Sequence, residues 1–199
     1  MNRLLVVVVL LLCVSGIAGA IDAATAPVTT PLVSLVIRSR AEWGAKPFVA
    51  EKMKPHRITR GIVVHHSAGR APKPGEEDQI VRNIQHFHMN DKKWGDVAYH
   101  YFICPSGLIL EGRPLAFAGD TGTVYDTTGL EQICMLGSYM KELPTPEALK
   151  ALTELVRRDM TTLGFKRDKV FAHRELAQTD CPGNELYKWY VEVFKESLP

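Results

Sequence analysis

A histidine and a cysteine lie close together near the end of the chain, in the segment VFAHRELAQTDCPG (170–183). The segment begins like a strand and is broken at Pro182-Gly183, with few bulky apolar residues between His173 and Cys181. Two interpretations are open: a core histidine beside one half of a disulfide, or two ligands of one metal ion. Imidazole nitrogen and thiolate sulfur are both common zinc ligands.

A third ligand of this kind is available in the strand-like segment IVVHHSAG (62–69). Neighbouring residues of a strand point to opposite faces, so only one of His65 and His66 can share a face with His173. Periodicity does not decide which one. A hydrolytic zinc site uses three protein ligands and keeps one position open for water, and one of these histidines with His173 and Cys181 would supply that set. The other histidines are expected at the surface (His56, His86) or in structural hydrogen bonds (His88, His100).

The N-terminus has the features of a secretory signal peptide. Arg3 precedes an apolar run over 4–14, and small residues follow up to Ala20, after which we predict cleavage. The run is shorter than the roughly 20 residues of a membrane span, so we expect no stable membrane span in the mature chain. A retained anchor is the alternative. The protein is therefore expected to be exported, to the periplasm or to the outside of the cell.

Composition predicts one domain behind a flexible leader. Residues 21–34 are rich in Ala, Thr and Pro, and residues 35–199 suit one compact domain with one core. Removal of residues 1–20 takes away Arg3 and no acid, so the net charge falls from +2 to +1. Such a balance gives no broad basic face, and we expect no nucleic-acid partner. The domain is expected to be a monomer.

The mature chain keeps Cys104, Cys134 and Cys181, an odd count for an exported protein. One cysteine must then be free, ligate a metal or pair with another chain. Cys104 and Cys134 lie in apolar, strand-like surroundings and are either two buried thiols or one disulfide. Cys181 differs from both in its surroundings, because it lies in a polar turn.

The elements that must position these residues are strands and helices intermixed along the chain. The helix over 145–164 is the clearest, with Thr145 as its cap, Pro146 in its first turn and Gly164 at its end. Ile80, Ile84 and Phe87 show helical spacing in the helix over 74–90. The pattern predicts an α/β fold, a single domain with a central mixed β-sheet flanked by helices. The other elements are strands over 61–69, 97–103, 108–112, 132–139 and 169–176, and a helix over 184–197.

Six segments in order resemble the type 2 superfamily of N-acetylmuramoyl-L-alanine amidases, and most closely its peptidoglycan recognition protein branch. The resemblance covers about residues 36–189, and SRAEWGA within its first segment is particular to that branch. The segments are IRSRAEWGA (37–45), IVVHHSAG (62–69), IQHFHMNDKKWGDVAYHYFI (84–103), GLILEGRPLAFAG (107–119), ICMLGSY (133–139) and AHRELAQTDCPG (172–183).

The resemblance implies a role for each candidate residue. His65, His173 and Cys181 match the zinc ligands, and His66 then faces the other way. Tyr99 matches the residue that polarises the attacking water. Thr179 stands where some amidases have a lysine, and could bond the oxyanion without supplying a charge. Relatives without catalysis typically lack the cysteine, so the complete ligand set favours an enzyme.

The substrate groove is less well defined by the resemblance. Many relatives carry a histidine near the zinc where this chain has Asp120 in FAGDTGTVYD (117–126). Trp94 and Arg113 are groove candidates by position, with a structural role as the alternative for each.

The expected function is zinc-dependent hydrolysis of the amide between N-acetylmuramic acid and L-alanine in peptidoglycan. Zn²⁺ suits this reaction because it lowers the pKa of water from ~15.7 towards ~7 and polarises the carbonyl. A peptidoglycan-binding protein with little or no catalysis is the main alternative. A zinc peptidase that acts on the stem peptide is a third.

Overall fold

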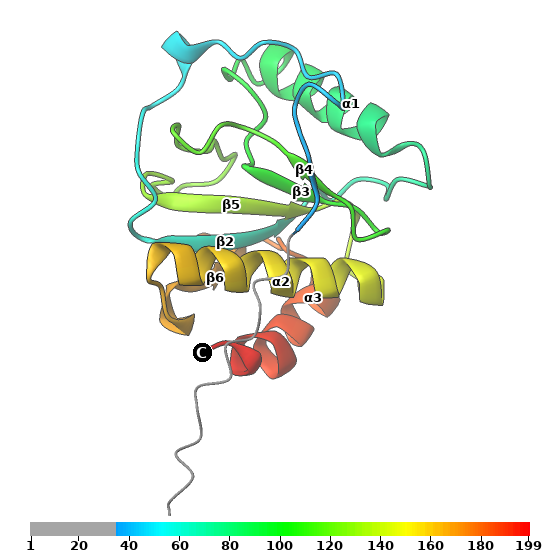
Figure 1. The fold of residues 1–199 in the computed structure, drawn as a ribbon, viewed down its shortest axis with the longest axis vertical. Helices are drawn as coiled ribbons and strands as arrows, with labels where there is room; N and C mark the ends of the chain where they lie inside the picture. Colours follow the sequence, from blue (N-terminus) through cyan, green and yellow to red (C-terminus); the bar gives the residue numbers. More distant parts are fainter. Residues whose placement is uncertain (1–34) are drawn as a thin grey trace, which may run out of the picture. The chain divides into compact units, whose positions relative to one another are not determined.

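The computed structural model describes residues 35–199, so the predicted signal peptide (1–20) and leader (21–34) lie outside the described residues. The described residues form a six-stranded mixed sheet in the order β1-β4-β3-β5-β2-β6, with three α-helices (Figure 1). The strands are β1 (Ile37–Arg38), β2 (Gly61–His66), β3 (Tyr101–Ile103), β4 (Ile109–Glu111), β5 (Leu130–Met135) and β6 (Val170–Ala172). The helices are α1 (Glu77–Asn90), α2 (Pro146–Leu163) and α3 (Asn184–Trp189). The predicted α/β fold with a central mixed sheet is therefore confirmed.

The sheet is mostly parallel around β2. Strand β2 pairs in parallel with β5 on one side and with β6 on the other, and β3 runs parallel to β5. Strands β3 and β4 form an antiparallel pair around the turn at Pro105–Gly107. Consequently the carboxyl ends of β2, β5 and β6 lie at one edge of the sheet, where residues that follow these strands can meet.

Helix α1 lies over one face of the sheet, and α2 and α3 lie over the other (Figure 1). Alternate strand residues divide between the two faces, as the two-residue period of a strand requires. Towards α2, Ile62, Val64, Ile133 and Met135 pack with apolar residues of α2 and α3. Towards α1, the core contains Trp43, Val81, Phe102, Leu110 and Cys134. His65 and Gln132 belong to the α1 face by this alternation.

Helix α2 ends as its sequence predicts. Thr145 Oγ1 accepts a hydrogen bond from Ala148 N at 3.2 Å, Pro146 opens the first turn, and Gly164 takes the left-handed conformation at φ 69°.

Helix α1 buries a different face from the one that its apolar residues indicate. Ile80 and Ile84 are only half-buried and Phe87 is 48% exposed, whereas Gln85 and His88 are buried.

The strand expected over 169–176 ends early. It stops at Ala172, and His173 begins a 3₁₀ turn (His173–Glu175). The reason is that Glu175 Oε2 accepts a hydrogen bond from Ala172 N at 2.9 Å, which folds the chain back at the strand end. The predicted C-terminal helix is likewise divided, since α3 is followed by a π turn over Tyr190–Phe194 and a 3₁₀ turn over Lys195–Ser197.

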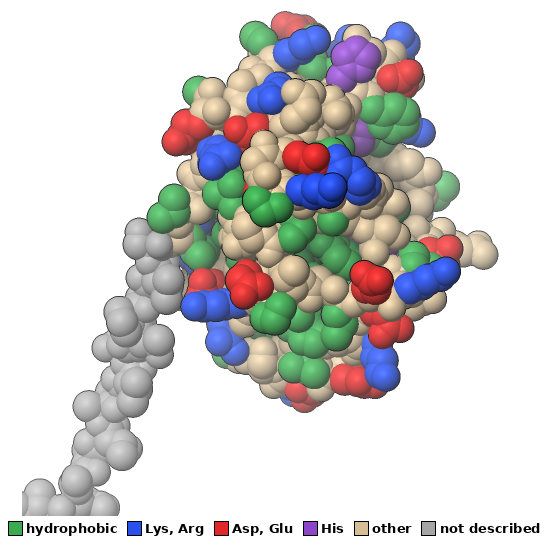
Figure 2. Space-filling model, turned by 90° about the vertical axis from the view of Figure 1, so that its right-hand side faces the viewer, with side chains coloured by type: hydrophobic (Ala, Val, Ile, Leu, Met, Phe, Trp, Pro, Cys, Tyr) green, Lys and Arg blue, Asp and Glu red, His purple; other side chains and the backbone are tan. Residues whose placement is uncertain are grey.

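The described cysteines are all free and buried, so Cys104 and Cys134 are two buried thiols, and the disulfide alternative does not hold. Within residues 35–199, no helix is both long and apolar enough to cross a membrane. Acidic and basic side chains are interspersed on the face seen in Figure 2 and do not gather by sign.

Candidate metal centre

Three side chains from distant parts of the chain meet at the carboxyl edge of the sheet. One ligand atom from each of His65, His173 and Cys181 lies within 4.8 Å of the other two, and all three residues are buried. His66 faces the other side, where its Nδ1 accepts a hydrogen bond from Tyr139 N at 3.3 Å. The structure thus brings together the ligand set that the sequence suggested, with His65 as the member of the adjacent pair.

Strand pairing positions the two histidines. Val64 on β2 is opposite Ala172, the last residue of β6, so His65 on β2 and His173 directly after β6 each lie one position further along the chain. Their ring centroids are 4.5 Å apart. A short distance between them therefore follows directly from the register of β2 and β6.

Backbone contacts bring Cys181 back to the histidines. Arg174 N donates to the Cys181 carbonyl at 3.1 Å, and His66 N donates to Cys181 Sγ at 3.4 Å. Gly183 has a φ of 99°, and a Cβ at this position would lie 2.4 Å from the Tyr139 carbonyl oxygen. Only glycine allows this close approach, which holds the end of the ligand loop against the sheet.

The donor atoms of this cluster fit a zinc ion. Cys181 Sγ lies 3.6 Å from His65 Nδ1, and His173 Nδ1 is buried without a hydrogen-bond partner. The other nitrogen of each ring is engaged, since His65 Nε2 lies 2.6 Å from Gln132 Oε1 and His173 Nε2 lies 2.8 Å from Thr123 Oγ1. In both rings Nδ1 is therefore the nitrogen that is left for a metal ion. Two imidazole nitrogens and one sulfur are a ligand set typical of catalytic zinc.

Burial sets the protonation of these groups. It lowers the pKa of His65 to about 3, with the neighbouring His173 as the next cause, and lowers that of His173 to about 4. Both rings are therefore neutral near pH 7 and have a lone pair for a metal. Burial raises the pKa of the Cys181 thiol to about 12. A bound cation reverses this effect, because a thiol that coordinates a metal ion is deprotonated.

Tyr99 and Thr179 lie beside the ligands. The Tyr99 ring centroid is 5.2 Å from that of His65, and burial raises the pKa of its hydroxyl well above the ordinary value. Tyr99 therefore keeps its proton and can act as a hydrogen-bond donor. Thr179 Oγ1 accepts a hydrogen bond from Cys181 N at 3.2 Å, so this side chain also orders the loop that carries the cysteine.

The three groove candidates differ in their surroundings. Trp94 is half-buried, and its ring packs 4.8 Å from that of His88, which in turn is 6.0 Å from Tyr99. Arg113 is 1% exposed and donates to the carbonyls of Val97 and Ala118 and to the Asp120 carboxylate. These contacts match the structural role that was the alternative for Arg113, and Asp120 is its ion-pair partner.

The other histidines have structural contacts or lie at the surface. His88 Nδ1 accepts from Ala98 N at 3.1 Å, and His100 Nδ1 accepts from Gln132 N at 2.8 Å, as expected of structural hydrogen bonders. His86 is exposed. His56, expected at the surface, is half-buried because its Nδ1 accepts from Gly129 N at 2.9 Å.

Three residues that were not expected from the sequence contact the ligand histidines or each other: Thr123, Tyr125 and Gln132. Tyr125 OH donates to Gln132 Oε1 at 3.0 Å, and its ring centroid is 5.2 Å from that of His173. One signal could have found Gln132: it is a polar residue in the middle of β5, all of whose residues are buried. Nothing in the sequence alone marks Thr123 or Tyr125.

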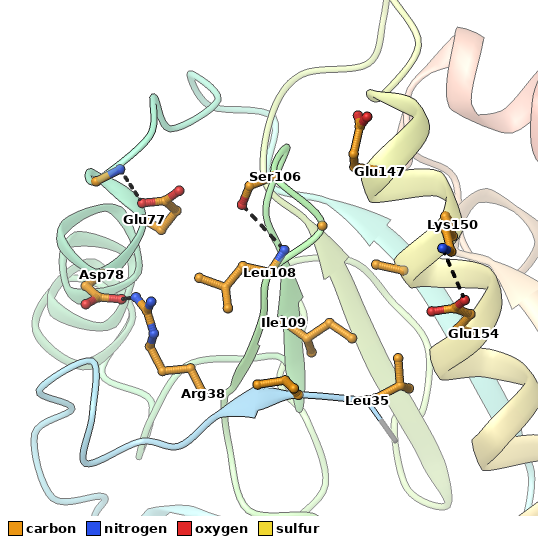
Figure 3. A pocket seen from close by; sticks show the side chains of 14 residues that line it. Leu35, Arg38, Glu77, Asp78, Ser106, Leu108, Ile109, Glu147, Lys150 and Glu154 are labelled. Atoms are coloured by element: carbon orange, nitrogen blue, oxygen red, sulfur yellow. Dashed lines mark hydrogen bonds and ion pairs between the residues drawn. The ribbon is translucent and has the colours of Figure 1, made fainter. Parts of the chain in front are cut away.

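One cavity among the described residues lies away from the metal cluster. It has a volume of about 830 Å³ and lies between the N-terminal parts of α1 and α2, beside the turn between β3 and β4 (Figure 3). Two ion pairs lie along it, Arg38 with Asp78 at 2.6 Å and Lys150 with Glu154 at 3.9 Å (Figure 3). A smaller hollow of about 290 Å³ begins at Ser67, two residues after His65, and is lined by Ile80, Ile84 and Phe87 of α1. The residues of α1 that stay outside the core therefore line a surface next to the ligand cluster.

Comparison with known proteins identifies related sequences and folds. The family profile described as N-acetylmuramoyl-L-alanine amidase matches residues 54–184. Mouse peptidoglycan recognition protein 1 is 34% identical over 153 residues, which cover 75% of this chain and 82% of the mouse protein. A pig protein named N-acetylmuramoyl-L-alanine amidase is 27% identical over 157 residues, covering 76% of this chain and 26% of the pig protein. The crystal structure of Drosophila peptidoglycan recognition protein SD superposes with a TM-score of 0.72 at 30% identity, covering 79% of this chain and 94% of that one.

Proposed function

Because the chain belongs to the N-acetylmuramoyl-L-alanine amidase family, we propose that it hydrolyses the amide between N-acetylmuramic acid and L-alanine in peptidoglycan, with Zn²⁺ held by His65, His173 and Cys181. The observation that carries the proposal is the convergence of these three ligands, with His173 Nδ1 buried and unpartnered. A buried nitrogen without a partner costs free energy, and a metal ion would satisfy it.

Zinc, when bound, supplies a Lewis acid for the scissile carbonyl and makes water a better nucleophile near neutral pH. The residues of the chain supply the rest. The Tyr99 hydroxyl, protonated and next to His65, donates a hydrogen bond at the reacting centre and orients the attacking water. The Thr179 oxygen is bonded by Cys181 N, which leaves its hydroxyl proton for the oxyanion that develops on the substrate.

The substrate approaches along the outer surface of α1 in this proposal. The hollow beside Ser67 combines the half-exposed Phe87 and the half-buried Ile80 and Ile84 with polar groups of Asn83 and Arg70. Such a surface suits an amphipathic ligand that has both sugar hydroxyls and a short peptide. Trp94 remains a groove candidate from its place near His88 and Tyr99, and Asp120 is expected to act on substrate contacts near the cluster.

The remaining parts of the proposal concern where the protein acts. The N-terminal residues 1–20 are proposed as a secretory signal peptide, and the mature chain as an exported monomer without a membrane span that acts on peptidoglycan. The names of its relatives support peptidoglycan as the partner.

The test is metal content together with product release. We expect the purified chain, expressed from residue 21, to contain about one zinc ion and to release stem peptides that begin with L-alanine from purified sacculi. Cys181→Ala should release none and still bind sacculi. Mass spectra of the fragments identify the bond that is cut, and fragments cleaved within the peptide would indicate a stem-peptide peptidase instead.

Recognition without catalysis is the second candidate, favoured by the names of two relatives that are 34% and 33% identical, both called peptidoglycan recognition proteins. It predicts binding to sacculi with no release of peptide by the zinc-loaded chain. A chain that stays metal-free after expression in zinc-rich medium, releases nothing and still binds sacculi would establish this second function in place of the first.

A further inference from the structure

We propose that Gln132 and the loop over residues 120–128 form an outer layer that orients both metal histidines, and that this layer determines the affinity of the site for zinc. The inference rests on the proposed function. It assigns roles to Thr123, Tyr125 and Gln132, which lie behind the ligands and not among them.

Gln132 orients His65. It is 1% exposed in the middle of β5, and its Oε1 lies 2.6 Å from His65 Nε2 and accepts a bond from Tyr125 OH at 3.0 Å. An amide oxygen accepts the Nε2 proton, so the neutral ring keeps its lone pair on Nδ1, which faces Cys181. Gln132 Nε2 is buried without a partner, so the amide is held through its oxygen alone. Packing does not explain a buried glutamine of this kind, because an apolar residue would fill the position without an unsatisfied group.

The loop orients His173 in the same manner. Thr123 Oγ1 lies 2.8 Å from His173 Nε2 and 2.8 Å from Thr121 Oγ1, and Thr123 N donates to Thr121 Oγ1 at 3.1 Å. The Tyr125 ring packs against His173 while its hydroxyl binds Gln132. The loop therefore contacts the outer side of His173 directly and reaches His65 through Gln132.

The loop is fastened at both ends. Asp120 pairs with the buried Arg113, and Thr127 Oγ1 donates to the Gly119 carbonyl at 2.6 Å. Arg113 is in turn fixed by the carbonyls of Val97 and Ala118. Such anchoring keeps Thr123 and Tyr125 in place before a metal arrives, so that little ordering of the ligands is left for the binding step.

The expected size of the effect follows from outer-layer partners in metal sites generally, whose loss costs about 10–100-fold in metal affinity. We expect Gln132→Leu and Thr123→Val each to weaken zinc binding within this range. Gln132→Glu keeps an acceptor for His65 Nε2 and should bind zinc at least as tightly as the parent chain. Thr128→Val is the matched control for Thr123→Val, since it removes a hydroxyl of the same loop whose hydrogen bond is to Lys54 Nζ and not to a histidine.

The experiment is a competition titration of the metal-free chains with zinc against a chelator of known affinity, with circular dichroism to verify folding. Tyr125→Phe should weaken binding in the parent chain and have no further effect in Gln132→Leu, because Tyr125 is expected to act on His65 through Gln132. A double-mutant cycle measures this coupling. If Gln132→Leu does not fold, the zinc affinities of Thr123→Val and Tyr125→Phe test the proposal instead.

The outcomes separate this inference from the proposed function. A parent chain that binds no zinc would overturn both. A parent chain that binds zinc, with Gln132→Leu and Thr123→Val unchanged in affinity, would overturn the outer layer alone. Equal losses in Thr123→Val and Thr128→Val would also overturn it, because the loop would then act through its general stability.

Discussion

At the scale of single residues, the adjacent histidines of β2 differ in the face that each occupies. His65→Ala removes one of three protein ligands and is expected to abolish stoichiometric zinc binding. His66→Ala should keep the metal. The imidazole that it removes accepts a hydrogen bond from Tyr139 N, and the backbone N–H of residue 66 still donates its hydrogen bond to Cys181 Sγ. The expected cost is about 1–3 kcal/mol of stability for a buried donor left unpaired. Zinc content and urea unfolding of both variants check this, and metal loss in His66→Ala alone would reverse the assignment.

Tyr99 offers a second test at this scale. Tyr99→Phe keeps the ring that packs against His65 and Phe102 and loses only the hydroxyl. We expect zinc content and melting temperature to stay at the parental values, and hydrolysis to fall by about 10²–10³-fold, as for the loss of one donor at a developing charge. The rate of peptide release from sacculi is the measurement. A variant that cleaves at the parental rate would make Tyr99 a packing residue only.

The limits of sequence reasoning at this scale have a physical origin. His173 and Cys181 stand out because their types and surroundings are unusual, and the resemblance of HHSA to the family was needed to choose His65. Thr123 and Tyr125 could not be found, since a threonine and a tyrosine in a polar loop have no distinguishing pattern. Their function depends on contacts across 50 residues for Thr123 and His173, which only the fold creates.

At the scale of elements, sequence signals predicted those helix boundaries that depend on neighbouring residues in the sequence. The cap, first-turn proline and terminal glycine of α2 fix that helix regardless of its neighbours, and its predicted boundaries agree with the structure within a residue. Strand β1 was missed because its two residues are extended only through pairing with β4. The early end of β6 depends on a side chain, Glu175, that caps the strand from beyond it.

The packing of α2 on β5 contains an acidic pair that makes stability depend on pH. Glu131 on β5 and Asp159 on α2 are 2% and 8% exposed, and Glu131 Oε1 and Asp159 Oδ2 are buried without partners. Arg158 Nε donates to the other Asp159 oxygen at 2.7 Å, and Arg158 Nη2 reaches Tyr101 OH on β3 at 3.4 Å. Burial, followed by the nearby Asp159, raises the pKa of Glu131 well above its ordinary 4.5.

The sign of the effect follows from proton binding. The folded state holds a proton on Glu131 at pH values where the unfolded chain, with the ordinary pKa near 4.5, has lost it. The contribution of Glu131 to stability is therefore greatest below pH 4.5 and falls as the pH rises towards the pKa of Glu131 in the folded state, by at most about 1.4 kcal/mol per pH unit. Glu131→Gln should have a flatter profile and exceed the parent chain in stability at pH 8.

Urea unfolding of the metal-free chain between pH 5 and pH 8 measures this dependence. Glu192→Gln, which changes an exposed acid in the C-terminal turns, is the control and should keep the parental slope. Equal slopes for Glu131→Gln and the parent chain would show that Glu131 is ionised in the folded protein.

At the scale of the whole molecule, the metal would connect parts that the chain keeps far apart. His65 and Cys181 are separated by 116 positions, and the ligand cluster joins the centre of the sheet to the loop that follows its edge strand β6. Because the unfolded chain has no assembled site, zinc binds the folded state preferentially, and its binding free energy becomes folding free energy. The metal is thus expected to stabilise the domain as well as to catalyse.

The last prediction measures this stabilisation. At free zinc of 100 times its Kd, the folded state gains about 2.7 kcal/mol, which for a domain of this size corresponds to a rise in Tm of roughly 5–10 °C. Cys181→Ala should remain folded and lose this rise. Cys104→Ala, which removes a buried thiol from the α1 side of the core, should start from a lower Tm and keep the full rise. Thermal unfolding with zinc and with chelator compares the three chains. A zinc-dependent rise that persists in Cys181→Ala would mean that the ion binds elsewhere, and the cysteine would then have no part in the metal centre.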